Sequence, residues 1–159
     1  SIQLAPMVEE IFTDLTPLAE KSGITLELAG DGVMTGSDAL IYRMIFNLTE
    51  NAIKYNRPDG SVQVCITQEP EKLLILVSDT GRGIPEEYQQ SIFQPFFRVD
   101  KSRSRTFGGA GLGLALVWEI AALHGGSVRV AESSDSGTTI AAELPRSGNH
   151  AAAPKNETL

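Results

Sequence analysis

The chain has 159 residues, of which 42% are hydrophobic and 21% charged, as in an ordinary folded domain. Its 13 basic and 20 acidic residues give a net charge of −7, so the surface repels phosphate backbones and argues against nucleic acid as the main partner. The single cysteine, Cys65, excludes an internal disulfide and a multi-cysteine metal site.

No run approaches the roughly 18 apolar residues of a membrane span, and no signal peptide opens the chain. The chain begins at Ser1 rather than Met, so we expect a fragment of a longer protein. We expect residues 1–146 to form one domain. The small, polar and alanine-rich residues 147–159 are predicted to form a disordered tail.

Hydrophobic periodicity and turn residues predict the elements in chain order. They are a helix over 6–21, a strand over 24–28, a helix over 37–55, strands over 62–67 and 73–78, a short helix over 86–92, a long loop over 94–110, a helix over 111–124, and strands over 127–132 and 138–144. Strand pairs on short turns imply antiparallel pairing. The predicted fold class is an α/β sandwich, with helices packed on one face of a mixed, largely antiparallel sheet.

The helix over 37–55 has two distinct faces. At 100° per residue, Asn47, Glu50, Asn51 and Lys54 share an arc of about 100°. The neighbouring arc is the predicted core stripe, made of Ile41, Met44, Ile45, Leu48, Ala52 and Tyr55. Amide oxygens suit Mg²⁺, Lys54 is a point charge suited to phosphate, and Glu50 is placed to orient a nucleophile or water. The alternative is a solvated face with an ordinary Glu50–Lys54 pair.

A glycine turn follows the predicted strand over 73–78. A carboxylate at a strand end, here Asp79, can accept a hydrogen bond from the exocyclic amine of adenine and so select the base. Gly81 and Gly83 let the backbone turn and approach a flat ring. The alternative is a plain strand-to-helix turn.

A second glycine-rich segment, residues 108–114, opens the last helix. Free N–H groups and the helix dipole make such a start an anion site. No strand precedes the glycines, which excludes a dinucleotide-binding Rossmann loop, and the Walker lysine motif is absent. The preceding loop has a local charge of +3 from Arg98, Lys101, Arg103 and Arg105 against Asp100. This charge suits a lid over a triphosphate, or a solvated basic loop.

The order of these motifs resembles the catalytic and ATP-binding domain of sensor histidine kinases, within the GHKL superfamily. The resemblance rests on four boxes, with the late HGG and GTT as further matches. The boxes are NLTENAIKY over 47–55, DTGRGIP over 79–85, FQPFFRVD over 93–100 and GAGLGL over 109–114; HGG spans 124–126 and GTT 137–139. The resemblance implies the Bergerat fold with bound ATP and Mg²⁺.

By that resemblance, Asn51 helped by Asn47 holds Mg²⁺, Lys54 meets the phosphates, and Asp79 reads the adenine amine. Arg98 and the basic lid neutralise the phosphate tail, and a threonine at 138 or 139 supports Asp79 through water. ATPase relatives use a carboxylate at the position of Glu50 to activate water, whereas in a kinase this carboxylate has only an orienting role. The implied catalytic residues are Glu50, Lys54 and Arg98. The implied ATP-binding residues are Asn47, Asn51, Lys54, Tyr55, Asp79, Gly81, Gly83, Ile84, Phe97, Arg98, Gly109, Gly111, Leu112, Gly113, Leu114 and Thr138.

The chain departs from the family pattern in two ways. Gln94 stands where the family more often has an acid, and no phosphoacceptor histidine segment is present. Of the two histidines, His124 ends a helix and is expected to be structural, and His150 lies in the tail. The implied partners are the absent dimerisation and histidine-phosphotransfer domain and a response regulator. The implied fragment is monomeric and cytoplasmic, and the implied parent is a homodimer that, if membrane-anchored, keeps this domain on the cytoplasmic side.

The leading functional prediction is a catalytic fragment that donates the γ-phosphoryl group of ATP to a histidine on another domain. Two alternatives stay open. One is a partner-switching serine kinase of the same superfamily, against which the phenylalanine box and HGG argue. The other is a non-catalytic ATP sensor, against which the retained polar residues of all four boxes argue.

Overall fold

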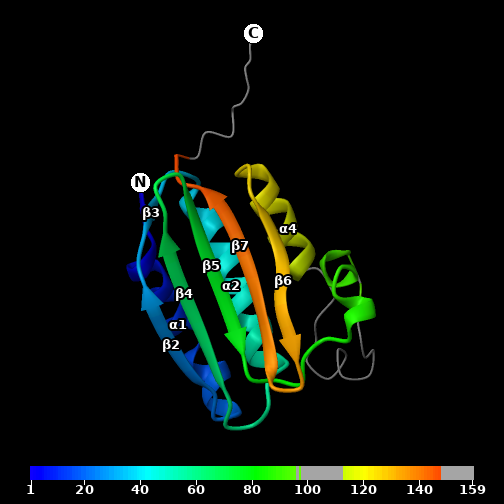
Figure 1. Cartoon of the computed structure of the whole chain (residues 1–159). Coiled ribbons are helices and arrows are strands. Elements are labelled where there is room, and N and C mark those ends of the chain that lie inside the picture. The colour runs from blue at the N-terminus through cyan, green and yellow to red at the C-terminus, as the bar shows by residue number, and fades with distance from the viewer. Residues whose placement is uncertain (96, 98–112, 148–159) are drawn as a thin grey trace.

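The computed structural model describes residues 1–95, 97 and 113–147. Its centre is a five-stranded sheet in the order β2-β4-β5-β7-β6. The strands are β2 (Thr25–Gly30), β4 (Ser61–Gln68), β5 (Lys72–Asp79), β6 (Ser127–Ser134) and β7 (Gly137–Pro145). The helices α1 (Leu4–Lys21), α2 (Asp38–Lys54) and α4 (Gly113–Leu123) all lie on one face of this sheet, behind it in Figure 1. The predicted fold class is confirmed.

The sheet is mixed, as predicted. β4 pairs with β5, β5 with β7 and β6 with β7, all antiparallel. β2 pairs with β4 in parallel, because the chain passes through α2 between these strands and returns in the same direction. The apolar run of β5 predicts a central strand, and β5 is the middle strand of the sheet.

Alternating side chains of the central strands build the core. Val64 and Ile66 of β4, with Ile75 and Val77 of β5, are at most 3% exposed and belong to one core cluster with the buried stripe of α2. The stripe differs from the prediction at its last member. Tyr55 is 37% exposed, because it caps the C-terminus of α2 and has left the helical spiral.

Two predictions about local structure were wrong or incomplete. The segment predicted as one short helix over 86–92 forms two 3-10 turns, η1 (Glu86–Tyr88) and η2 (Ser91–Phe93), closed by i to i+3 hydrogen bonds. A segment this short gains few α-helical hydrogen bonds for its nucleation cost. The pairing of β1 (Ile2–Gln3) with β3 (Val33–Met34) was not predicted, because two-residue strands show no period.

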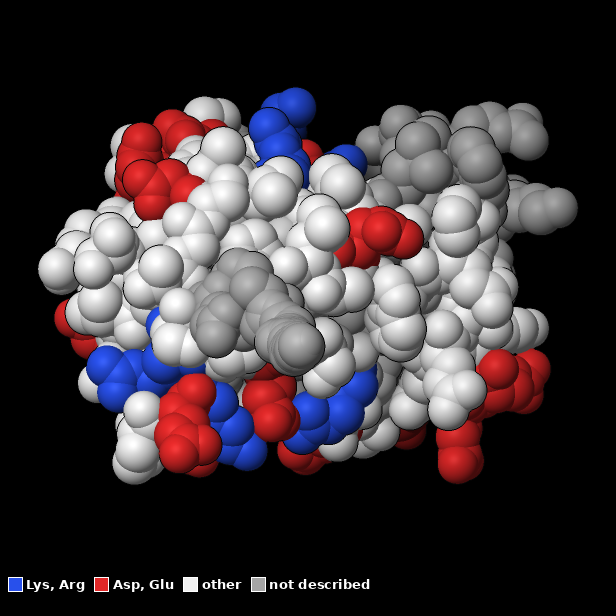
Figure 2. All heavy atoms as spheres, turned by 90° about the horizontal axis from the view of Figure 1, so that it is seen from above, with Lys and Arg blue, Asp and Glu red and all other residues white. Residues whose placement is uncertain are grey.

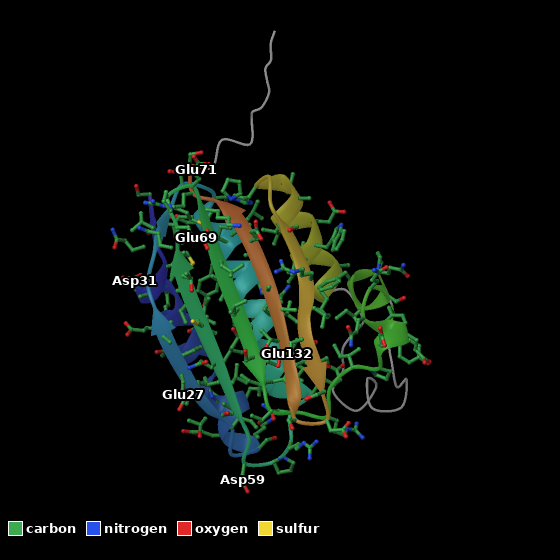
Figure 3. All side chains as sticks on the ribbon, viewed as in Figure 1. Glu27, Asp31, Asp59, Glu69, Glu71 and Glu132 are labelled. Atoms are coloured by element: carbon green, nitrogen blue, oxygen red, sulfur yellow. The ribbon has the colours of Figure 1, made fainter. Side chains whose placement is uncertain are left out.

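Charges of both signs are interspersed on the end of the molecule seen in Figure 2. The six acidic residues labelled in Figure 3 lie in strands β2 and β6, in the turns after β2 and β4, and in the segment that joins α2 to β4. They are Glu27, Asp31, Asp59, Glu69, Glu71 and Glu132. Among the described helices, none has the length and hydropathy to cross a bilayer.

Candidate nucleotide-binding site

Asp79 ends β5 and lies opposite Thr138 of β7. Its Oδ1 atom accepts two backbone hydrogen bonds, from Gly81 N at 2.9 Å and from Thr138 N at 3.2 Å. Within the described part of the chain, its Oδ2 atom has no hydrogen-bond partner. One carboxylate oxygen is therefore fixed by the fold, and the other is left to accept a hydrogen bond from a ligand.

The environment of Asp79 opposes its charge. Burial raises the pKa of the Asp79 carboxyl above its ordinary value, while the hydrogen bonds from Gly81 and Thr138 lower it and only partly compensate. A carboxyl with a raised pKa in a half-buried position is a common mark of a functional site, although structural networks also produce such shifts.

Glycine is required at two positions of the turn after Asp79, for a different physical reason at each. Gly83 has a φ of +86°, and a Cβ there would stand 2.1 Å from the carbonyl oxygen of Ser134. A Cβ on Gly81 would stand 2.5 Å from the carbonyl oxygen of Tyr55, at the end of α2. The turn is therefore held between β6 and α2, and no side chain at either position fits without a shift.

A hydroxyl link that sequence reasoning missed joins this turn to the sheet. The Oγ atom of Ser133 accepts a hydrogen bond from Ile84 N at 2.8 Å and lies 2.9 Å from the Oγ1 atom of Thr138. Thr138 is 5% exposed, and its backbone N–H donates directly to Asp79; support of Asp79 through water stays a prediction. Nothing in the residue pattern distinguishes Ser133 from the other small residues of its hairpin.

A second network joins the turn to the end of α2. The Oγ1 atom of Thr80 donates to Asn56 Oδ1 at 2.9 Å and accepts from Ser61 N at 2.9 Å. The Asn56 amide also donates to the Ser61 carbonyl at 2.8 Å. The sequence marks Asn56 only as a turn residue, yet its side chain fastens the end of α2 to the residue after Asp79.

The polar face of α2 is partly buried. Asn47 is 8% exposed, and its Nδ2 atom donates to the carbonyl oxygen of Gly113, the first residue of α4, at 3.3 Å. Lys54 Nζ lies 3.8 Å from Glu50 Oε2 as the predicted i,i+4 pair, and Asn51 is half-buried. α2 therefore presents two amides, a carboxylate and an ammonium group along one face.

The donor set of α2 fits Mg²⁺. The described residues hold no cluster of three or more His, Cys, Asp or Glu side chains that could bind a metal by themselves. Mg²⁺ does not need such a cluster, because it keeps several waters and takes its remaining ligands from one or two protein groups and from phosphates. With the Asn47 amide nitrogen bonded to Gly113, the oxygen of this amide remains available as a hard ligand.

Of the other predicted site residues, some lie within the described part of the chain and some outside it. The ring of Phe97 packs on Tyr88 with centroids 5.6 Å apart, and Leu114 packs partly buried against the core. Gly113 starts α4, and among the described residues no atom would lie within 4 Å of a Cβ there. Arg98, Gly109, Gly111 and Leu112 lie outside the described residues. The structure thus joins Asp79, Gly81, Ile84 and Thr138 at one place, and Asn47 with Gly113 at another.

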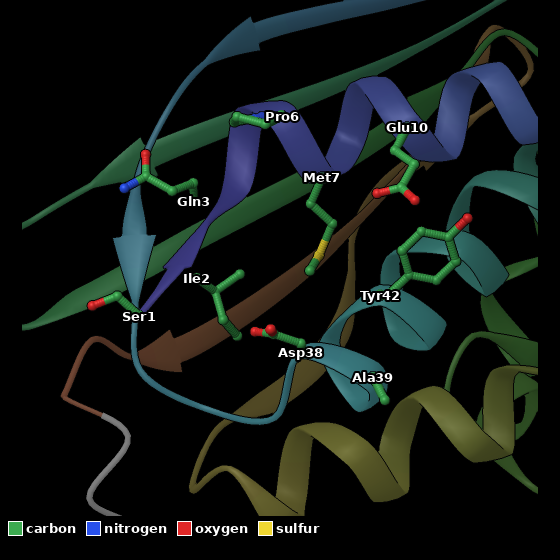
Figure 4. Close-up of a pocket in the computed structure, with 9 residues that line it drawn as sticks. All are labelled: Ser1, Ile2, Gln3, Pro6, Met7, Glu10, Asp38, Ala39 and Tyr42. Carbon is green, nitrogen blue, oxygen red and sulfur yellow. The ribbon is translucent and has the colours of Figure 1, made fainter.

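A hollow of about 520 Å³ lies elsewhere, between the first turns of α1 and α2 (Figure 4). It is lined by Ser1, Ile2, Gln3, Pro6, Met7, Glu10, Asp38, Ala39 and Tyr42. Burial, followed by the hydrogen bond to Asp14, raises the pKa of Tyr42 to about 12. Because Asp38 and Ala39 open α2 whereas Asn51 and Lys54 lie in its last turn, this hollow is separate from the predicted nucleotide site.

A half-buried carboxylate at the end of a central strand, beside a helix that carries two asparagines and a lysine, is the arrangement of a GHKL-type nucleotide-binding domain. The family described as histidine kinase-, DNA gyrase B- and HSP90-like ATPase matches residues 36–148. The chain therefore belongs to this family.

Named relatives place the chain on the histidine-kinase branch. The sensor histidine kinase RppB of Synechocystis is 34% identical over 145 residues, which cover 89% of this chain and 32% of RppB. The mycobacterial sensor histidine kinase MprB superposes with a TM-score of 0.78 at 27% identity, over 92% of this chain and 96% of that structure. Full-length ShkA in complex with AMPPNP superposes with a TM-score of 0.78 at 25% identity, over 89% of this chain and 30% of ShkA.

These similarities support the ATP-binding catalytic domain of two-component kinases as the type of this chain. The chain spans about a third of the length of RppB, so the match concerns only part of that relative.

Proposed function

We propose that the chain binds Mg²⁺-ATP and that, within its parent kinase, it donates the γ-phosphoryl group to a histidine on a dimerisation domain. The observation that carries the proposal is the carboxylate of Asp79, whose Oδ1 atom is held by two backbone amides while Oδ2 has no partner among the described residues. With Oδ1 fixed in this way, Oδ2 is placed to accept a hydrogen bond from the amine of adenine and disfavours the carbonyl that guanine has there. ShkA was crystallised with an ATP analogue, which supports the same ligand class here.

The roles of the remaining residues follow from their chemistry. Gly81, Gly83 and Ile84 form the turn against the base, and Tyr55 covers the base or ribose from the exposed end of α2. Asn47 and Asn51 would hold Mg²⁺, which when bound shields the phosphate charge. Phe97 and Leu114 are proposed to border the ligand. Gly109, Gly111, Leu112 and Gly113 are proposed to cradle its phosphates.

Phosphoryl transfer needs little covalent chemistry from the protein, so catalysis is mainly positioning and charge neutralisation. Lys54 holds a terminal phosphate oxygen, and Arg98 is proposed to share this role. Glu50 keeps the Lys54 ammonium oriented through their contact of 3.8 Å. The bond between the γ-phosphorus and its bridging oxygen breaks, ADP leaves with that oxygen, and the acceptor imidazole nitrogen forms the new bond.

The proposed partners are the dimerisation and histidine-phosphotransfer domain and a response regulator. The chain alone is proposed to be a monomer of the cytoplasm and its parent a homodimer. A parent anchored in a membrane would keep this domain on the cytoplasmic side. The chain alone has no acceptor histidine segment, so we expect no stable histidine label when it is incubated with ATP by itself.

Transfer in trans tests the proposal. The chain is incubated with Mg²⁺ and [γ-³²P]ATP, together with candidate histidine-bearing dimerisation domains supplied as separate chains. We expect a label on such a domain that acid removes and base does not, as for phosphohistidine. An acid-stable serine label would establish the partner-switching alternative. ATP binding without any label would favour the non-catalytic sensor.

A further inference from the structure

His124 connects the end of α4 to the start of α2. It is 4% exposed; its Nδ1 atom lies 2.9 Å from the carbonyl oxygen of Ile120, and its Nε2 atom lies 3.2 Å from the backbone nitrogen of Ser37. The Ser37 N–H can only donate, so Nε2 must accept. The proton of the neutral ring is then on Nδ1, which donates to Ile120.

The start of α2 is shaped around this ring. Ser37 is the N-cap residue of α2, and its side chain accepts a hydrogen bond from Leu40 N at 3.2 Å. A Cβ on Gly36 would stand 2.8 Å from Cδ2 and 3.0 Å from Nε2 of His124. The chain can pass this close to the imidazole only because residue 36 has no side chain.

A second polar contact joins the same two helices at the other end of α4. Asn47 Nδ2 donates to Gly113 O at 3.3 Å. Ser37 and Asn47 are ten residues apart, as are Gly113 and Leu123, and each stretch of helix spans about 15 Å. The two helices therefore run antiparallel, and polar contacts join them at both ends of α4.

We infer that His124 is a positioning residue for the nucleotide. This inference rests on the proposed function. By holding the C-terminal end of α4 on the N-cap of α2, His124 sets where Gly113, at the other end of α4, lies relative to Asn47. Gly113 belongs to the glycine segment proposed to cradle the phosphates, and Asn47 is a proposed Mg²⁺ ligand. One hydrogen bond remote from the ligand thus aligns two parts of its phosphate subsite.

The inference predicts an effect on one end of the ligand only. A helix is stiff, so releasing one end of α4 displaces the other, and small displacements in a site have large effects on positioning. The adenine subsite is built from β5, β6, β7 and the turn around Gly81, and within the described part of the chain none of its hydrogen bonds involves α4. Loss of the His124 contact should therefore weaken binding of the phosphates and leave adenosine binding unchanged.

Two substitutions separate the two bonds of the ring. His124→Asn keeps a short amide that can donate to Ile120 O but does not reach Ser37 N. His124→Gln places an amide oxygen at the distance of Nε2 and restores the acceptor for Ser37. We expect His124→Asn to raise the Kd of Mg²⁺-ATP about tenfold, which corresponds to about 1.4 kcal/mol, and His124→Gln to restore most of the affinity.

The measurements are calorimetry for Mg²⁺-ATP and NMR titration for adenosine, on chains whose folding is verified by circular dichroism. Gly36→Ala is a second variant, which keeps a histidine at position 124 but pushes its ring away with the new methyl group. It should weaken Mg²⁺-ATP binding as His124→Asn does. Unchanged ATP affinity in folded His124→Asn and Gly36→Ala would overturn the inference. Equal losses for ATP and adenosine would also overturn it, since they indicate general destabilisation. Absence of ATP binding by the unsubstituted chain would instead contradict the proposed function.

Discussion

Tyr55 and Gly81 meet so closely that a Cβ atom on Gly81 would stand 2.5 Å from the Tyr55 carbonyl oxygen. This approach joins the end of α2, which carries Asn51 and Lys54, to the turn that follows Asp79. The residues proposed for the phosphates and for the base come from segments separated in sequence, and this contact brings their backbones together.

We therefore expect Gly81→Ala to lower the free energy of unfolding by about 1–3 kcal/mol, because backbone atoms rather than a flexible side chain oppose the new methyl group. Urea denaturation measures this change. Stability equal to that of the unsubstituted chain would show that the turn and the end of α2 move apart freely.

Gly113→Ala is the matched glycine substitution with the opposite expectation. No atom of the described residues lies within 4 Å of a Cβ at this position, and the residue is the first of α4. Alanine should leave stability unchanged or raise it by up to about 1 kcal/mol. ATP affinity should fall nonetheless, if phosphate approaches the backbone there. Calorimetry that finds full ATP affinity would remove Gly113 from the proposed phosphate cradle.

Ser133→Ala tests the hydroxyl link under the glycine turn. The substitution leaves the Ile84 N–H and the Thr138 hydroxyl without their partner, so the free energy of unfolding should fall by about 1–3 kcal/mol. Ser136→Ala, in the exposed turn of the same hairpin, is the control and should change stability by less than about 0.5 kcal/mol. Equal effects of the two substitutions would contradict the role given to Ser133.

Lys54→Met should separate binding from stability. The Glu50–Lys54 pair is partly exposed and adds only about 0.3–0.5 kcal/mol to the helix. A charge-assisted bond to phosphate is stronger, so ATP affinity should fall tenfold or more. Lys72→Met, which removes a lysine paired with Glu143, is the control and should bind ATP normally. Similar ATP affinities for the two variants would exclude Lys54 from the site.

Because the pKa of Asp79 is raised, the difference in stability between the unsubstituted chain and Asp79→Asn should depend on pH. Because the folded state binds a proton at Asp79 more readily than the unfolded state, this group contributes most stability below its ordinary, unfolded pKa of 3.8. The contribution is lost as pH rises through the raised pKa of the folded state. Asp79→Asn cannot titrate, so its stability relative to the unsubstituted chain should increase from pH 3 to pH 7. A difference that is constant with pH, or that declines, would contradict the pKa direction.

The sequence predicts much of this fold because the long elements have clear periods. α2 and the β4–β5 pair lie within a residue or two of their predicted bounds. Asp79 could be singled out because a carboxylate at the end of a predicted apolar strand, followed by a glycine turn, can accept a hydrogen bond from the exocyclic amine of adenine. The predicted boundary at residue 146 and the tail over 147–159 remain predictions, with 148–159 outside the described residues.

The rest of the site depends on tertiary contacts that leave no local pattern. Ser133 matters only because its hairpin brings it under Ile84, and Asn56 only because Thr80 lies beside it. Tyr55 fits the helical stripe by angle, but the helix ends one residue earlier. The pairing of Asn47 with Gly113 likewise requires knowing that α2 and α4 are neighbours.

Calorimetric titration of nucleotide tests the central claim most directly. ATP and GTP are titrated, with and without Mg²⁺, into the unsubstituted chain and into Asp79→Asn. The account predicts that the chain binds ATP but not GTP, that Mg²⁺ changes the affinity, and that Asp79→Asn stays folded and loses ATP binding. Equal binding of ATP and GTP, or full ATP affinity in folded Asp79→Asn, would contradict an adenine site at Asp79.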